Sequence, residues 1–370
     1  MKITLIGPVP PYRGGIAHFT QNLAENLLQN GHDVLTISYR KQYPKWLYPG
    51  KSEKDFSQEI KIKDARFLFS PLNYLDWKKT LQAIKNFESD LVVYQWWVTF
   101  WAPATAWLIQ KLNRLGIPIR VLVHNAFPHE KGWLDKKLAK FALKDARYFV
   151  TMSEKESTRL KTVVNNDSEI EISAHPIYAQ FPQSGLSKAE VREKLGLPME
   201  SKIALFFGFV RPYKGLGVLL EAMGMLKREN VDLHLVVAGE FWQDKADYLT
   251  QIDNLNISNM VTIHDEYIPD SEAGLFFEAA DFFVAPYLDG TQSGSIKIAM
   301  GYHLPMVISD VIIDPLILNY QHGLSVVKAG VATELSKEIQ AINEGAVAES
   351  PEILRPSKDS WSPLLNAFLR

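Results

Sequence analysis

The sequence contains no cysteine, which excludes disulfide bonds and metal sites built from thiolates. The absence fits a reducing compartment such as the cytoplasm. Only five or six residues, most of them apolar, precede Gly7 and Pro8, and this run is too short for a secretory signal peptide. We therefore expect a first β-strand there, in a cytoplasmic protein.

Long hydrophobic runs are also scarce. The exception is the segment Leu91–Ile109, which has no charged residue and is long enough on paper to span a bilayer. It contains Pro103 and several polar residues, and its first residues are β-branched or aromatic. We expect a buried strand followed by a helix that starts near the proline, with a transmembrane span as the alternative.

The 370 residues are 46% hydrophobic and 22% charged, as in ordinary globular proteins, and the length favours two domains. Short apolar runs alternate with amphipathic segments, which predicts an α/β fold with parallel sheets. A break at 173–186 separates two similar halves, and Ser187 and Glu190 after it form a predicted capping box. We expect two Rossmann-like, doubly wound lobes that face each other across a cleft. The expected segments are 1–176, 177–355 and a final helix within 356–370.

The net charge of −2 hides an asymmetry between the halves. Residues 1–176 carry 25 basic and 17 acidic side chains, so this half has a net charge of +8. The remaining residues carry 15 and 25, which gives −10. The basic half favours an anionic lipid or a phosphorylated acceptor as partner, and electrostatic matching between the lobes is the alternative. We expect no nucleic-acid partner.

The segment 202–217 predicts a site for an anion. An apolar strand ends at Gly208, the cations Arg211 and Lys214 follow, and a helical pattern begins after Gly215. Two fixed cations, free backbone N–H groups and the positive end of a helix dipole suit a phosphate or diphosphate. A solvated loop whose cations bind nothing is the alternative.

Three further loops follow expected strands. Gly14 and Gly15 directly precede a helix, but their spacing is not the G-x-G-x-x-G of dinucleotide sites. His124 stands at the end of a strand, where it can hydrogen-bond a sugar hydroxyl or a developing charge, with a structural role as the alternative. Residues 286–301 offer hydroxyl groups and glycine at a helix start, a cradle for an anion or nucleotide. The candidates in this last loop are Thr291, Gln292, Ser293, Gly294 and Ser295.

Residues 131–144 form a basic amphipathic segment, in which lysines flank an apolar stripe. Such a segment can lie on a membrane surface. The alternative is a helix packed on the core with solvated lysines. His129 and Glu130, just before it, lack the spacing of a zinc helix with His124, so we expect no metal.

These motifs together resemble the retaining glycosyltransferases of family 4, which have the GT-B architecture. The elements that carry the resemblance keep the family's order over nearly the whole chain. They are Gly14-Gly15, His124-Asn125 with Pro128-His129-Glu130, Arg211 with Lys214-Gly215, Gly239-Glu240, and Tyr287 with Thr291-Gln292-Ser293-Gly294.

The resemblance implies that the second lobe binds a sugar nucleotide, with UDP-sugar or GDP-sugar as co-substrate, and that the first lobe binds a lipid-linked or polysaccharide acceptor. Arg211 and Lys214 would hold the diphosphate, Gly15 would meet the donor phosphate, and His124 would contact the transferred sugar. The other donor-side candidates are Gly14, Gly208, Gly239, Glu240 and the 291–295 loop. The acceptor-side candidates are Tyr12, Arg13, Trp96, Trp97 and Asn125. The final helix would cross back onto the first lobe.

The sequence departs from the family in two ways. Many relatives have two glutamates in the loop after the Tyr287 strand, and here Ile298 or Ala299 stands at the second and Asp289, Gly290 or Thr291 near the first. Many relatives also place the arginine directly after the glycine that is Gly208 here, a position that Phe209 occupies.

A metal-independent sugar transfer is the leading hypothesis, because no D-x-D motif occurs and the two cations can stabilise the leaving diphosphate. The missing glutamates motivate the alternative of a catalytically silent relative that binds sugar nucleotide or supports a partner enzyme. A two-lobed solute-binding protein would need export, and an NAD-dependent enzyme would need the missing glycine fingerprint.

Overall fold

The computed structural model divides the chain into two compact units. The first contains Met1–His175 together with Trp361–Arg370, and the second contains Pro176–Ser360. The residues that the structure describes are 1–42, 52–55, 62, 65–127, 133–177, 183–242, 244–290, 292–345 and 360–370.

The first unit is built on a seven-stranded parallel sheet with the order β3-β2-β1-β4-β5-β6-β7. Its strands are β1 (Lys2–Ile6), β2 (Asp33–Tyr39), β3 (Arg66–Phe69), β4 (Leu91–Trp96), β5 (Ile119–Val123), β6 (Tyr148–Thr151) and β7 (Glu169–Ile172). Its helices are α1 (Gly15–Gln29), α2 (Tyr74–Phe87), α3 (Ala102–Leu115), α4 (Trp133–Leu143), α5 (Glu154–Lys161) and α13 (Ser362–Leu369). The strand order reverses between β1 and β4, and such a switch point is where open α/β sheets bind ligands.

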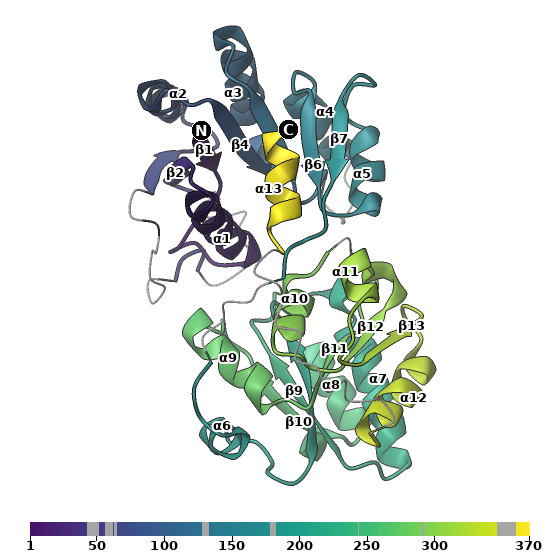
Figure 1. Ribbon diagram of the computed structural model, residues 1–370. Helices are drawn as coiled ribbons and strands as arrows, with labels where there is room; N and C mark the ends of the chain where they lie inside the picture. Colours follow the sequence, from purple (N-terminus) through teal and green to yellow (C-terminus); the bar gives the residue numbers. More distant parts are fainter. Residues whose placement is uncertain are drawn as a thin grey trace. The chain divides into compact units, whose positions relative to one another are not determined.

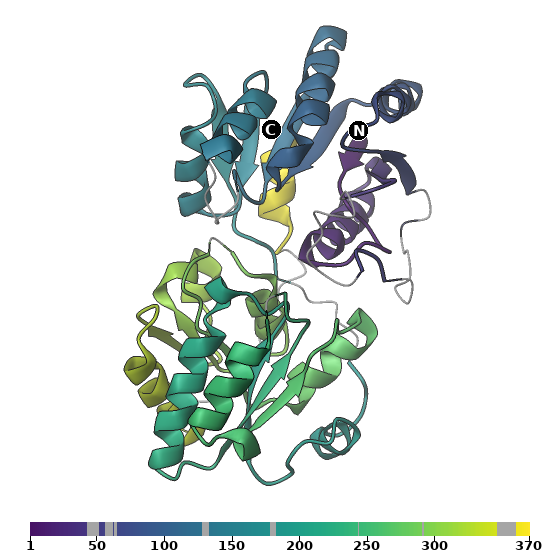
Figure 2. The same cartoon turned by 180° about the vertical axis from the view of Figure 1, so that it is seen from behind.

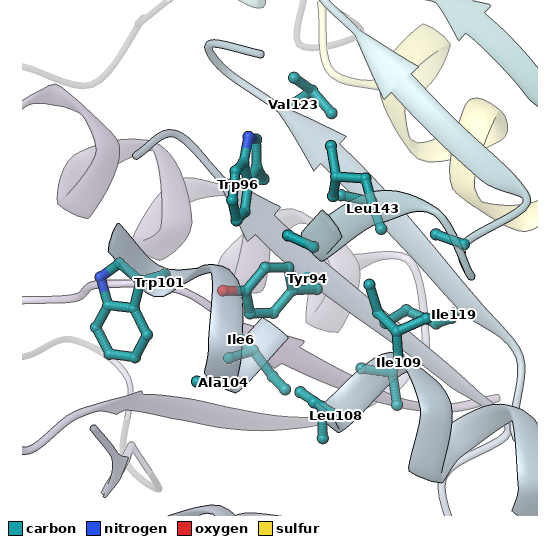
Figure 3. Close-up of a cluster of buried hydrophobic side chains, with 14 of the residues drawn as sticks. Ile6, Tyr94, Trp96, Trp101, Ala104, Leu108, Ile109, Ile119, Val123 and Leu143 are labelled. Atoms are coloured by element: carbon teal, nitrogen blue, oxygen red, sulfur yellow. The ribbon is translucent and has the colours of Figure 1, made fainter. Parts of the chain in front are cut away.

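The core of this unit lies between the sheet and α3. Figure 3 shows Ile6, Tyr94 and Trp96 from the strands packed toward the α3 side chains. All six residues of β4 are buried, as expected for a parallel strand that is covered on both faces. The uncharged segment Leu91–Ile109 is thus a buried strand and the start of a helix. Within the described ranges, no helix is both long and apolar enough to cross a membrane.

The second unit holds a six-stranded parallel sheet with the order β10-β9-β8-β11-β12-β13. Its strands are β8 (Lys202–Phe207), β9 (Leu233–Ala238), β10 (Val261–His264), β11 (Phe282–Ala285), β12 (Met306–Ser309) and β13 (Leu324–Val327). Its helices are α6 (Lys188–Lys194), α7 (Leu216–Arg228), α8 (Ala246–Asn254), α9 (Asp270–Ala279), α10 (Gly294–Gly301), α11 (Pro315–Leu318) and α12 (Ala332–Asn343). Helix α10 lies on the face of the sheet seen in Figure 1, and α7 and α8 cover the face seen in Figure 2. The switch point lies between β8 and β11.

The predicted α/β class with two doubly wound sheets is confirmed. The capping box is also present, since the Ser187 side chain accepts from the backbone N–H of Glu190 and the Glu190 carboxylate accepts from that of Ser187. Among the described strands and α-helices, two were not predicted, the four-residue edge strand β3 and the single-turn helix α11. Both are too short to show a hydrophobic period in the sequence.

Candidate functional site

In the second unit, the carboxyl ends of β8, β9 and β11 meet backbone to backbone, and glycines permit this approach. Gly208 and Gly239 follow β8 and β9, and a Cβ added at Gly239 would collide with the Gly208 carbonyl oxygen. Gly215 precedes α7 with a φ of 75°, and an added Cβ there would stand 1.9 Å from the carbonyl oxygen of Pro286, which follows β11. The strand ends at the switch point therefore form one compact backbone surface.

Two cations lie over this surface. The short 3₁₀ helix η2 (Pro212–Lys214) brings Lys214 Nζ so close to Gly208 that a Cβ on the glycine would be only 2.8 Å away. The same ammonium is 5.7 Å from the centre of the Tyr287 ring. The guanidinium of Arg211 is 5.5 Å from the centre of the Trp242 ring. Both cations are half-buried at strand ends, where they can stabilise a bound anion.

Three hydroxyl groups gather where β11 leads into α10. The Tyr287 hydroxyl shares hydrogen bonds with Ser293 Oγ at 3.0 Å and Ser295 Oγ at 3.1 Å, and the two serine oxygens are 3.0 Å apart. Ser293 is also the N-cap of α10, where its Oγ accepts from the backbone N–H of Ile296 at 3.4 Å. Hydroxyl groups can reorient to donate to anionic oxygens, so this cluster can complement the two cations.

The other residues expected on the donor side differ in burial and in their place in the fold. Gln292 is half-buried, and Gly294 is the first residue of α10. Glu240 is buried directly after Gly239, and its backbone carbonyl accepts from the backbone N–H of Val210 at 2.9 Å. Thr291 lies outside the described residues.

The position that resemblance assigns to an arginine holds part of an aromatic stack. The Phe209 ring is 4.4 Å from that of Trp242 and 6.1 Å from that of Tyr267, with interplanar angles of 34° and 33°. These rings follow β8, β9 and β10, so the stack crosses the ends of three neighbouring strands. Phe209 therefore supplies a packing surface at this place, and the cation comes two residues later.

The position of the second family glutamate is apolar and buried. Ile298 and Ala299 both lie on α10 and face the interior. Beside them, Lys297 is fully buried and its Nζ is 2.6 Å from the Asp314 carboxylate. Burial lowers the pKa of Lys297, and the nearby Asp314 opposes this shift. No carboxylate replaces the glutamate at 298 or 299.

In the first unit, Gly14 and Gly15 begin α1. Gly14 is the N-cap with a φ of 105°, and no side chain in the described residues caps this helix start. Gly15 is exposed, and a Cβ there would meet no described atom within 4 Å. The first turn of α1 therefore leaves space beside Gly15, where a ligand could approach backbone N–H groups, and the role predicted for Gly15 stays a prediction.

His124 directly follows β5 and is buried, with 3% of its surface exposed. Its Nε2 is 2.8 Å from Gln95 Oε1, and its ring meets the Phe19 ring edge-on at 5.1 Å. Burial, and to a smaller extent the nearby His175, lower the pKa of His124 to about 3. The imidazole is therefore neutral near pH 7 and acts there through hydrogen bonds rather than through charge.

Three predicted acceptor-side aromatics belong to the core. The side chains of Tyr12, Trp96 and Trp97 are buried in the hydrophobic cluster of the first unit. Their side chains therefore expose little or no surface to an acceptor. Arg13 and Asn125 are half-buried and keep part of their surface accessible.

Sequence reasoning did not single out three residues around His124. These are Gln95 in β4, Thr20 in α1, and Trp361, whose ring is 5.2 Å from that of Phe19. They come from distant parts of the chain, so no local pattern marks them. The predicted loop residues His129 and Glu130 lie outside the described residues. Within the described part, no group of three or more His, Asp or Glu side chains is placed to hold a metal ion.

Comparisons by sequence connect the chain with two glycolipid-synthesising proteins. It is 31% identical over 170 residues to alpha-monoglucosyldiacylglycerol synthase of Streptococcus pneumoniae, which covers 43% of this chain and 37% of that protein. It is 24% identical over 204 residues to GDP-mannose:glycolipid 4-beta-D-mannosyltransferase of Xanthomonas campestris pv. campestris, which covers 55% of this chain and 53% of that protein. The matches thus span between about a third and a half of the relatives' own lengths.

Comparisons of structure show the same fold in solved proteins. Sucrose-phosphate synthase from Thermosynechococcus elongatus has a TM-score of 0.69 and 18% identity over 99% of this chain and 94% of its own. HepE of Anabaena, solved with UDP and glucose, has a TM-score of 0.69 and 15% identity over 100% of this chain and 95% of its own.

Two family models match the chain, one for each unit of the fold. Residues 13–177 match the model described as Glycosyltransferase Family 4, and residues 201–344 match that of Glycosyl transferases group 1. The chain therefore belongs to glycosyltransferase family 4 and has the GT-B architecture.

Proposed function

We propose that the protein transfers a sugar from a nucleoside-diphosphate sugar to a lipid-linked or polysaccharide acceptor, with retention of anomeric configuration and without a metal ion. The observation that carries the proposal is the position of Lys214 over the Gly208 backbone, beside the hydroxyl cluster and the start of α7. Departure of a nucleoside diphosphate develops negative charge, which preorganised cations and helix N-termini stabilise. Lys214 and Arg211 take this role.

The proposed donor and acceptor follow from the substrates and products for which the similar proteins are named. One relative is named for GDP-mannose and one solved neighbour contains UDP, so UDP-sugars and GDP-sugars are both candidate donors. Both sequence relatives are named for glycolipid products or acceptors, which supports a lipid-linked acceptor. Gly15 would offer backbone N–H groups to the donor phosphate, and His124 would hydrogen-bond the transferred sugar.

The test is an assay of nucleoside diphosphate release with a panel of UDP- and GDP-sugars and a membrane lipid extract as acceptor. Lys214→Ala is expected to lower release by on the order of 10²-fold, the typical loss for one group that stabilises developing charge. Arg228→Ala, an exposed cation at the far end of α7, is the matched control and should leave the rate unchanged. Equal rates for wild type and Lys214→Ala would remove Lys214 from the mechanism. Anomeric analysis of the product and release in the presence of a chelator test retention and metal independence.

A silent sugar-nucleotide-binding relative is the second candidate, because Ile298 and Ala299 offer no carboxylate for a ribose. Calorimetric titration separates the two. Tight donor binding without turnover on any acceptor extract favours the silent relative, whereas turnover excludes it.

We also propose peripheral contact with the inner face of the plasma membrane through residues 131–144, of which 133–144 are described. The α4 side chains Trp133, Leu134 and Phe141 are exposed by 74%, 53% and 48%, whereas the opposite face of the helix packs on the core through Ala139, Ala142 and Leu143. Lys137 lies 4.4 Å from the centre of the Trp133 ring, so cationic and apolar groups occur together. This combination suits an anionic lipid surface.

Co-sedimentation with vesicles containing anionic phospholipid tests this contact. Trp133→Ser with Leu134→Ser is expected to weaken binding strongly, and added salt should weaken wild-type binding as well. Leu318→Ser, which removes an equally exposed leucine in the second unit, is the control. Binding that is insensitive to salt and to the α4 change would exclude the contact.

A further inference from the structure

A buried chain of hydrogen bonds links His124 to the first turns of α1. His124 Nε2 is 2.8 Å from Gln95 Oε1, and Gln95 Nε2 donates to Thr20 Oγ1 at 2.8 Å. The Thr20 hydroxyl in turn donates to the backbone carbonyl of Ile16 at 2.8 Å. The chain therefore joins the carboxyl ends of β5 and β4 to the helix that Gly15 begins.

The direction of each hydrogen bond follows from the last group in the chain. A backbone carbonyl only accepts, so the Thr20 hydroxyl donates its one proton to the Ile16 carbonyl oxygen. Toward Gln95 the hydroxyl can therefore only accept. This fixes the amide of Gln95 with its NH₂ toward Thr20 and its oxygen toward His124. An amide oxygen also only accepts, so the ring nitrogen that faces it, Nε2, carries a proton.

Burial makes this arrangement strict. Thr20 and Gln95 are fully buried, so a reversed amide would leave two acceptors, the Gln95 amide oxygen and Thr20 Oγ1, facing each other away from water. Gly7 provides the space, because a Cβ there would stand within 3 Å of Gln95 Nε2 and Thr20 Oγ1. A residue larger than glycine at position 7 would push the amide from its place.

We propose that Gln95, oriented by Thr20, is a positioning residue that holds His124 as the Nε2–H tautomer. The other ring nitrogen, Nδ1, is then a hydrogen-bond acceptor, so a hydroxyl that approaches it donates its proton to the ring. The second part rests on the proposed function, in which that hydroxyl belongs to the transferred sugar. The first part concerns the protein alone.

The test compares two substitutions of Thr20 in the full chain. Thr20→Val keeps the shape but removes the acceptor of the Gln95 amide, which can then rotate and present its NH₂ to His124. Thr20→Ser keeps the hydroxyl and is the matched control. Proteins labelled with ¹³C and ¹⁵N in histidine report the protonated ring nitrogen of His124 by two-bond NMR correlations, and His124→Gln assigns the signals.

We expect one Nε2–H tautomer near pH 7 in wild type and Thr20→Ser, and an added Nδ1–H population in Thr20→Val. A wild-type ring protonated at Nδ1, or a Thr20→Val spectrum that matches wild type, would overturn the proposal. A role of Thr20 in packing alone would leave the tautomer unchanged in the valine variant.

Kinetics then test the part that depends on sugar transfer. Thr20→Val should lower kcat on the order of 10-fold, the size of a lost supporting hydrogen bond at a site, and Thr20→Ser should restore it. A restored tautomer without restored kcat would refute the link to the ligand. If no donor is turned over by wild type, the proposed function fails while the NMR result on Gln95 still decides the first part.

Discussion

Alanine in place of Gly215 should disrupt the donor-side loops more than any other single methyl group added there. Gly215 joins η2 to α7, and its added Cβ would stand 1.9 Å from the Pro286 carbonyl oxygen. The same contact region includes the backbone hydrogen bond from Leu288 N–H to the Tyr213 carbonyl oxygen at 2.7 Å. Because both sides are backbone, neither can yield by rotating a side chain. We expect η2 and the loop after β11 to separate.

The loss of folding free energy expected for Gly215→Ala has two parts. A residue other than glycine with φ near 75° costs roughly 1–2 kcal/mol of folding free energy. Forcing two packed segments apart adds about 1–3 kcal/mol. Gly196→Ala isolates the first part, because Gly196 has a φ of 65° in the same unit and a Cβ there meets no described atom within 4 Å.

Urea unfolding of the full chain and calorimetric titration with the donor provide the measurements. Gly215→Ala should lose about 1–3 kcal/mol more stability than Gly196→Ala, and it alone should lose donor affinity. Equal destabilisation of the two variants, with donor affinity intact in both, would refute the idea that these strand ends must touch.

Three other predictions concern buried groups. Folding lowers the pKa of His124 from 6.5 to about 3, so at acidic pH the unfolded chain binds a proton that the native state does not bind. The free energy of unfolding of wild type should therefore fall by about 2 kcal/mol between pH 7 and 5. Urea unfolding of His124→Gln should not show this fall. Lys297→Met leaves the Asp314 carboxylate buried without its cation and should cost about 3–5 kcal/mol, and adding Asp314→Asn should recover part of this loss in a double-mutant cycle. Trp361→Ala should cost about 3–5 kcal/mol and shift the NMR signals of His124, because the Phe19 ring lies against both side chains; an unchanged His124 spectrum would contradict this.

The elements of the fold were largely predictable because they depend on local patterns. Buried parallel strands such as β4 and β9 are mostly apolar runs, each interrupted by one polar residue, Gln95 or His234, and the Ser187 capping box is a four-residue signal. The family could also be predicted, because loops at fixed places between those elements carried the resemblance.

Side-chain orientation at the ends of strands could not be predicted in the same way. Trp96 ends β4 and Trp97 follows it, and successive side chains of an ideal strand point to opposite faces of the sheet. In the structure both are buried. Trp96 Nε1 donates to the Ala126 carbonyl oxygen at 3.0 Å, and the Trp97 ring lies 5.5 Å from the Tyr39 ring. Such contacts depend on tertiary packing, so the sequence could not show that these aromatic residues, expected on the acceptor side, are buried in the core.

Backbone pairing beyond Gly208 explains why the arginine comes at position 211 rather than at position 209. Pairing between β8 and β9 resumes beyond Gly208, since Val210 N–H donates to the Glu240 carbonyl oxygen at 2.9 Å and Trp242 N–H donates to the Val210 carbonyl oxygen at 3.1 Å. Each extended residue advances the chain by roughly 3.3 Å, so the cation is carried beyond the strand end before it stacks on Trp242. The aromatic residue after Gly208 is therefore part of a strand extension that delivers Arg211, rather than a substitute for it. A comparison of the residue after Gly208 alone would suggest that the cation is missing, although the structure has Arg211 at the end of the same strand.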